Sequence, residues 1–216
     1  MQHKLLNLAL LAGLSLSGAA QAGLIDRGGG LIYDSVLNIT WLQNANYGAG
    51  SSYDNGSNTT DGRMTWDNAM AWAANLSYYD SVRNVTYDDW RLPTALNQNG
   101  TGPCLGYNCT SSEMGHLFYV DGGLNAGQSI LASTTLDDYF TNMQSSLYWS
   151  GTEYAPPPSG AWVFNAGDGY QILSDKNFSY YAWAVRPGDV AAVPEPATLM
   201  LLGLGLAGLG AMRRRG

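Results

Sequence analysis

Short runs of apolar and β-branched residues, separated by turn residues, open and close the central part of the chain. Residues 31–34 and 38–42 are two such runs on either side of a three-residue gap, which predicts a β-hairpin. Four short aromatic runs in the last third predict further strands: residues 147–150, 161–164, 170–173 and 182–186. Asp168-Gly169, between the second and third of these runs, predicts a tight hairpin.

The period of the pattern becomes helical between these two groups of strands. Apolar residues at positions 66, 69, 72, 73 and 76 share one helix face, and Thr65 is the expected N-cap. A second helix is predicted to begin near Thr110, because Thr110 and Glu113 have capping-box spacing before apolar residues at 114, 117 and 118. Strands, two helices and then an antiparallel meander predict an α+β domain with the helices packed beside one sheet.

The first 22 residues have the three parts of a secretory signal. A short basic start precedes an apolar run over residues 5–16, and an Ala-Gln-Ala sequence then ends at Ala22. We therefore expect cleavage between Ala22 and Gly23. An N-terminal membrane anchor is the alternative, although the apolar run is short for a membrane span.

The other end has a motif, an apolar stretch and a basic tail. The motif and tail residues are Val193, Pro194, Glu195, Pro196, Arg213, Arg214 and Arg215. Between them, residues 197–212 carry no charge and predict a transmembrane helix of about 24 Å, with the arginines on the cytoplasmic side. The predicted organisation is a signal peptide over 1–22, one domain over 23–190 and a sorting segment over 191–216.

This C-terminal pattern resembles the PEP-CTERM sorting signal. The resemblance implies an exosortase as partner, passage through the inner membrane, and cleavage near the Pro-Glu-Pro motif. It also implies delivery to the surface or extracellular matrix of a Gram-negative bacterium that makes exopolysaccharide. A plain C-terminal membrane anchor is the alternative.

Charge excludes one class of partner. Residues 23–193 contain six basic and sixteen acidic side chains, which gives a net charge near −10. Phosphate binding needs Lys and Arg to displace counterions, so we expect no nucleic-acid partner. Cys104 and Cys109 allow one intrachain pairing, and export favours a disulfide worth about 2 kcal/mol that closes a small loop.

Several motifs occur in the order seen in the Lcl C-terminal domain family. They are Asp34, Thr40-Trp41, Trp66 with Ala69, and residues 90–94, 112–114, 148–150, 161–164 and 184–186. The chain resembles this family over roughly residues 32–186. The resemblance implies a C-type-lectin-like fold in which the first and last strands pair beside two helices. The chain departs from the family pattern by an insertion over residues 95–111.

The mature region offers little for catalysis. His116 is its only histidine, so a serine-hydrolase triad or a zinc signature lacks the residues it needs. Arg91 and Arg186 are interpreted as structural, with Arg91 packed on Trp rings and paired with a carboxylate such as Asp88 or Asp89, rather than as ligand-binding cations. The chain is therefore predicted to be no enzyme, and a carbohydrate-active enzyme using two carboxylates is the alternative.

No cofactor or metal is predicted for the core. The calcium site of C-type lectins usually carries Glu-Pro-Asn or Gln-Pro-Asp together with Trp-Asn-Asp, and these triplets are absent from the core. A different Ca²⁺ site using Asp168 or Asp175 is the alternative. Aromatic faces near the strand ends are candidates for stacking on sugar rings, and core packing is their alternative role. These candidates are Tyr154, Tyr180, Tyr181 and Trp183. The leading function is binding or adhesion in the envelope or exopolysaccharide, and a structural matrix protein without a specific ligand is a further alternative.

Overall fold

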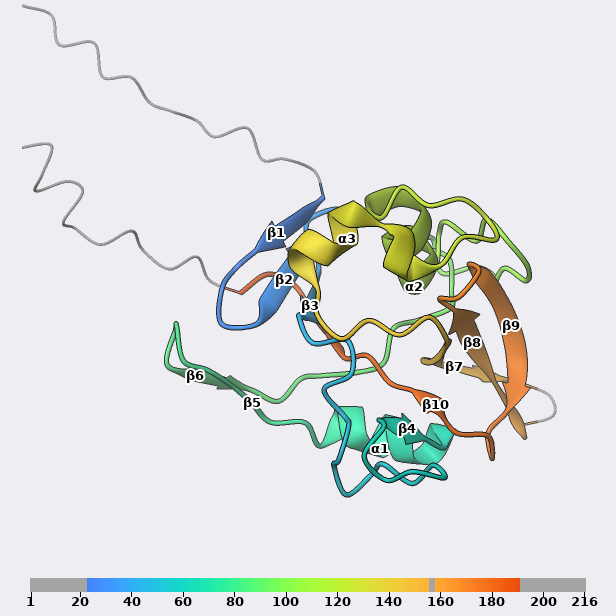
Figure 1. Ribbon diagram of the computed structural model, residues 1–216, viewed down its shortest axis with the longest axis horizontal. Helices are drawn as coiled ribbons and strands as arrows, with labels where there is room; N and C mark the ends of the chain where they lie inside the picture. The colour runs from blue at the N-terminus through green and yellow to red at the C-terminus, as the bar shows by residue number, and fades with distance from the viewer. Residues whose placement is uncertain (1–22, 156–157, 191–216) are drawn as a thin grey trace, which may run out of the picture.

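The computed structural model describes residues 23–155 and 158–190 (Figure 1). The predicted signal peptide, the sorting segment and its helix over 197–212 lie outside the described residues. Within those two described ranges, no helix is both long and apolar enough to cross a membrane.

The smaller sheet joins the two ends of the domain. Its strands are β1 (Leu24–Asp26), β2 (Leu31–Asp34), β3 (Ile39–Leu42) and β11 (Val185–Pro187), in the order β1-β2-β3-β11. The predicted hairpin is confirmed as β2 and β3, and Asn38 turns the chain with a φ of 53°. The last strand, β11, pairs antiparallel with β3, whereas the first strand, β1, pairs with β2; the first and last strands share one sheet but do not pair as the family resemblance implies.

The larger sheet has the order β4-β10-β7-β8-β9. Its strands are β4 (Arg63–Met64), β7 (Leu147–Tyr154), β8 (Gly160–Asn165), β9 (Tyr170–Asp175) and β10 (Tyr180–Tyr181). Strands β7, β8 and β9 form the predicted antiparallel meander, although the turn before β9 has four residues rather than two. These sheets and a few short helices confirm an α+β architecture, but the prediction of one sheet is wrong, because the strands divide between a four-stranded and a five-stranded sheet.

The prediction of one strand over residues 182–186 is wrong. The chain leaves the larger sheet after β10, crosses the core, and enters the smaller sheet only at β11. Trp183 fills the crossing: its ring is fully buried, and its indole N–H donates to the Leu42 carbonyl at 2.7 Å. This hydrogen bond satisfies a polar group that burial would otherwise leave without a partner.

A further two-stranded hairpin, β5 (Tyr78–Asp80) with β6 (Val85–Tyr87), was not predicted. Its turn is held by Asp80, which is fully buried and accepts a hydrogen bond from the Arg83 guanidinium at 2.6 Å. Burial raises the pKa of Asp80, but the hydrogen bonds from the Arg83 guanidinium and from two backbone N–H groups stabilise the charged form more strongly, so the pKa is lowered.

The first predicted helix is confirmed as α1 (Trp66–Ala74), which buries Ala69, Trp72 and Ala73. Thr65 stands at the N-cap position, but its side chain makes no capping hydrogen bond. Two short helices follow later in the chain, the 3₁₀-helix η2 (Ile130–Ala132) and α3 (Thr134–Tyr139).

The second predicted helix is present but differs in its start and its winding. Its N-cap is Ser112 rather than Thr110, with the Ser112 hydroxyl accepting from the Gly115 N–H at 3.2 Å. One turn, α2 (Glu113–Gly115), continues into a π-helix, η1 (His116–Asp121). Glu113 is therefore the first helical residue, and its carboxylate turns toward Arg91 instead of back to a cap.

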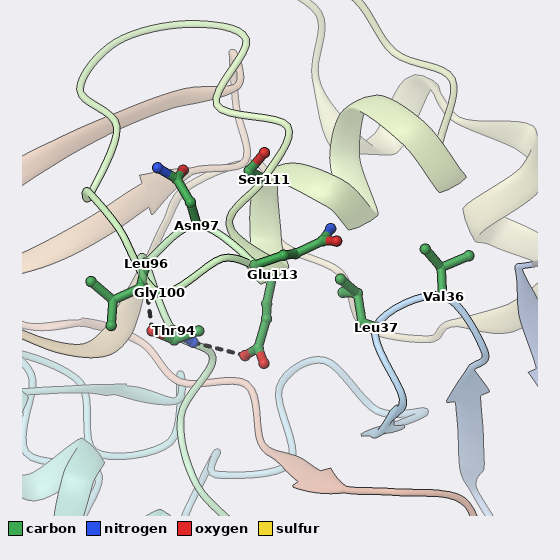
Figure 2. Close-up of a pocket in the computed structure, with 9 residues that line it drawn as sticks. Val36, Leu37, Thr94, Leu96, Asn97, Gly100, Ser111 and Glu113 are labelled. Carbon is green, nitrogen blue, oxygen red and sulfur yellow. Dashed lines mark hydrogen bonds between the residues drawn. The ribbon is translucent and has the colours of Figure 1, made fainter.

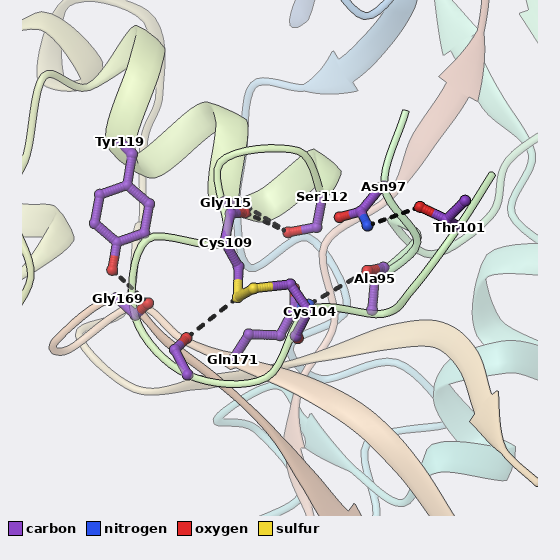
Figure 3. The surroundings of a disulfide bond; sticks show 11 residues. Ala95, Asn97, Thr101, Cys104, Cys109, Ser112, Gly115, Tyr119, Gly169 and Gln171 are labelled. Atoms are coloured by element: carbon purple, nitrogen blue, oxygen red, sulfur yellow. Dashed lines mark hydrogen bonds between the residues drawn. A yellow bond between two sulfur atoms is a disulfide. The ribbon is translucent and has the colours of Figure 1, made fainter. Parts of the chain in front are cut away.

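The insertion over residues 95–111 is fastened to the larger sheet (Figure 3). The predicted Cys104–Cys109 disulfide is confirmed. The buried Gln171 side chain on β9 donates to the Cys104 carbonyl at 2.7 Å and to the Ala95 carbonyl at 3.3 Å. Gly106 and Gln171 also exchange two backbone hydrogen bonds of 2.9 Å each, so the loop extends the sheet edge.

Candidate functional site

Two exposed aromatic side chains, Tyr154 at the end of β7 and Phe178 before β10, lie on the same sheet as the half-buried Tyr180. We call Tyr154, Phe178 and Tyr180 the aromatic ledge. Phe178 is 59% exposed, and its ring stacks on that of Tyr180 with a centroid distance of 6.1 Å and an interplanar angle of 27°. Large apolar faces in water are costly, so a group of them often marks a binding surface.

A shallow hollow of about 280 Å³ lies beside the aromatic ledge. It is lined by Tyr154, Ser159, Gly160, Leu173, Ser174 and Asp175. The Ser174 hydroxyl donates to the Tyr180 hydroxyl at 3.1 Å, which joins the hollow to the ledge. This surface combines aromatic faces with hydroxyl and carboxylate groups, the two kinds of group that orient a sugar.

The four candidate sugar-stacking residues therefore separate into two pairs. Tyr154 and Tyr180 belong to the aromatic ledge; Tyr154 is 37% exposed, whereas Tyr180 is half-buried against the core. Tyr181 and Trp183 are 6% and 0% exposed and pack in the core, so the prediction that they stack on a ligand is corrected. Phe178 was missed, because it lies in the turn after β9, outside any periodic pattern.

A larger cleft, of about 440 Å³, lies beside the smaller sheet (Figure 2). The turn after β2 supplies Val36 and Leu37 on one side, and the inserted loop supplies Leu96, Asn97 and Gly100 on the other. Its other lining residues are Thr94, Gln98, Ser111 and Glu113.

Glu113 connects this cleft to Arg91. The Arg91 guanidinium donates two hydrogen bonds to the Glu113 carboxylate, at 2.6 and 2.7 Å, and the Thr94 N–H donates a third at 2.8 Å. Arg91 is thus structural, as predicted, but the expected partner Asp88 or Asp89 is wrong for it. Asp89 instead pairs with Arg186, whose guanidinium also lies 4.2 Å from the Tyr87 ring centre.

A buried group of three ionisable side chains lies next to the cleft. Asp34 ends β2, and His116 and Asp121 stand at the two ends of η1. The His116 Nε2 and Asp121 Oδ2 atoms are 3.7 Å apart. Burial and the facing Asp34 carboxylate together raise the pKa of Asp121 to about 7.

The π-helical winding brings His116 and Asp121 together. In an α-helix, residues five positions apart point about 140° away from each other. The π-helix closes i→i+5 hydrogen bonds, such as Gly122 N–H to the Leu117 carbonyl at 2.9 Å, and so aligns residues with this spacing. Asp34 is fixed separately, because its Oδ1 accepts from the Val36 and Leu37 N–H groups at 2.9 Å each.

Asp34, His116 and Asp121 form the only trio of His, Cys, Asp or Glu side chains in residues 23–155 and 158–190 that is compact enough to share one ion. Asp168 and Asp175, the alternative calcium ligands, instead stabilise turns. Asp168 accepts from the Tyr170 N–H, and Asp175 accepts from the Asn177 N–H, each at 2.9 Å.

Two comparisons with known families match this chain. A family model described as the Lcl C-terminal domain matches residues 30–186. A model described as the PEP-CTERM protein-sorting motif matches residues 192–215, which cover the predicted sorting residues. This motif is a sorting signal recognised by exosortase and implies export to the cell surface. No curated protein matches the chain.

Proposed function

Because the chain belongs to the Lcl C-terminal domain family and carries a PEP-CTERM sorting motif, we propose that it is a non-enzymatic carbohydrate-binding protein of the cell surface. Its site of action is the envelope or the exopolysaccharide matrix of a Gram-negative bacterium, where it acts in adhesion. Before exosortase processing, the protein is held in the inner membrane for a short time.

The aromatic ledge is the observation that carries this proposal. The Phe178 and Tyr154 rings offer apolar faces on which the C–H face of a pyranose can stack. The hydroxyl of Ser174 and the carboxylate of Asp175 lie in the adjoining hollow, where they can bind sugar hydroxyl groups. Such a site needs neither a metal nor a nucleophile.

Charge favours a neutral glycan as the ligand. The net charge near −10 over residues 23–193 repels polyanions. Lys176, the cation nearest to the ledge in sequence, is already paired with Glu153 and lies 4.0 Å from the Trp66 ring centre. A polyuronate or sulfated polymer would therefore find no compensating charge there, whereas a neutral hexose polymer needs none.

The test measures retention of the full chain on immobilised polysaccharide. We expect Phe178→Ala to weaken binding about 5- to 10-fold, since one aromatic contact contributes about 1 kcal/mol. Tyr79→Ala is the matched control, because Tyr79 is 58% exposed but lies on β5, away from the ledge. This control should bind as the wild type does.

Two results would contradict the proposal. One is equal binding by the wild type and Phe178→Ala. The other is an unretarded wild-type chain on every native polysaccharide column, together with unchanged cell aggregation after deletion of the gene. The second result would favour a structural matrix protein without a specific ligand.

One observation favours the alternative of a carbohydrate-active enzyme. Asp34 and Asp121 face each other, and the pKa of Asp121 is raised. Glycosidases use such a pair of carboxyl groups, in which the one with the raised pKa is the general acid. Both side chains are buried, however, so a glycosidic bond does not reach them without local opening. Release of reducing ends by the wild type but not by Asp121→Asn would support hydrolysis and refute the non-enzymatic proposal.

A further inference from the structure

We propose that Asp34, His116 and Asp121 bind a zinc ion next to the cleft between the β2–β3 turn and the inserted loop. This site is separate from the aromatic ledge, on the other sheet, and its existence does not depend on glycan binding. It draws its ligands from two parts of the chain that lie about 80 residues apart.

The donor atoms already surround a volume of the right size. One donor atom from each of the three side chains lies within 4.8 Å of the other two, and His116 Nε2 is 3.7 Å from Asp121 Oδ2. Tetrahedral zinc with bonds of about 2.0–2.2 Å holds its ligand atoms about 3.4 Å apart. Each donor therefore needs to move by less than about 1 Å, which a small side-chain rotation supplies.

The three side chains also have unused bonding capacity that points to a ligand. Asp34 is 0% exposed, and the side chains of His116 and Asp121 are each 6% exposed. Asp34 Oδ2, His116 Nε2 and Asp121 Oδ2 nevertheless have no hydrogen-bond partner among the residues that the structure describes. Buried polar atoms without partners are destabilising, and one cation would bind all three at once.

The chemistry of the donor set selects the ion. Two carboxylates and one imidazole nitrogen suit zinc, which takes His nitrogen and Asp oxygen together. Calcium prefers six to eight oxygen ligands, and this pocket offers a nitrogen and few oxygens. The +2 charge of zinc would also neutralise the two carboxylates, which repel each other in a buried position.

Neighbouring groups hold two of the three ligands in place. The Val36 and Leu37 N–H groups fix Asp34 Oδ1 and leave Oδ2 for the ion. The His116 Nδ1 atom lies 3.5 Å from the Gln98 Nε2 atom. Turning the Gln98 amide over would bring its oxygen to the ring, where it would accept the Nδ1 proton and leave the Nε2 lone pair for zinc. Gln98, Val36 and Leu37 all line the cleft, so the three ligands lie directly behind its lining.

The test is zinc titration of the full chain, purified in detergent and treated with EDTA, by calorimetry and native mass spectrometry. We expect one Zn²⁺ per chain and a rise in melting temperature on zinc addition. Asp121→Asn and His116→Gln should each weaken binding at least about 100-fold and abolish the rise in melting temperature. Asp138→Asn, which removes an exposed carboxylate, is the matched control and should bind as the wild type does. Gln98→Ala should weaken binding about 10- to 100-fold.

Folding is checked separately. In EDTA, Asp121→Asn should unfold cooperatively, because Asn has the shape of a protonated Asp. If the wild type binds no zinc, or if Asp121→Asn and His116→Gln both bind it as the wild type does, the proposal is wrong. Binding of Ca²⁺ alone, with no response to zinc, would also overturn it. None of these results bears on the Phe178→Ala experiment, so the two proposals fail independently.

Discussion

Removing the Glu113 charge tests how much a partly buried ion pair stabilises this fold. Glu113→Gln keeps the size of the side chain but breaks two charge-assisted hydrogen bonds from Arg91 and weakens the one from Thr94. Breaking a fully buried pair costs about 3–5 kcal/mol. The Arg91 side chain is 40% exposed and recovers part of its hydration, so we expect a loss of about 2–3 kcal/mol.

The measurement is urea and thermal unfolding of the wild type and the variant. A loss of this size lowers the melting temperature of a domain of this length by about 4–12 °C. The urea midpoint should fall with an unchanged slope, because the surface exposed on unfolding stays the same.

Asp189→Asn is the matched control for Glu113→Gln. Asp189 also receives two hydrogen bonds from one guanidinium, that of Arg27, but both of these side chains are partly exposed. The control should cost less than about 1 kcal/mol. Equal losses in Glu113→Gln and Asp189→Asn would refute the reasoning from burial.

Two further predictions concern the disulfide and pH. Replacing both Cys104 and Cys109 with Ser should lower the free energy of unfolding by no more than about 2 kcal/mol. The loss is small because the closed loop is short and because Gln171 still binds it. Urea unfolding of the variant and of the wild type, with and without reductant, measures this difference. Burial and the facing Asp34 carboxylate raise the pKa of Asp121 from 3.8 to about 7, so its contribution to stability is full below pH 4 and is lost as pH rises to 7. In EDTA, the wild type should therefore lose on the order of 4 kcal/mol relative to Asp121→Asn between pH 4 and 8, and parallel pH profiles for the two chains would contradict this.

Elements with local signals were predicted correctly. The β2–β3 hairpin and the β7–β9 meander follow from short apolar and aromatic runs between turn residues, and α1 follows from a period of 3.6. The disulfide followed from there being only two cysteines. In each case the information lies within a few residues.

The elements and sites that were missed depend on distant contacts or on unusual backbone geometry. A helical period of 3.6 places His116 and Asp121 on different faces, so only the π-helix reveals that they adjoin. Asp34 lies far from both in sequence. The crossing at Trp183 was missed because a buried aromatic run looks the same whether it forms a strand or passes between two sheets.

The pairing of β3 with β11 brings the beginning and the end of the domain into the same sheet. The described chain begins and ends beside the smaller sheet: the Gly23 N–H donates to the Ser35 hydroxyl at 2.9 Å, and the Gly188 N–H donates to the Asn38 carbonyl at 2.8 Å. Strands β7 and β9, in contrast, belong to the larger sheet (Figure 1). A polymer bound at the aromatic ledge would therefore contact the larger sheet and leave uncovered the smaller sheet, where the described chain begins and ends.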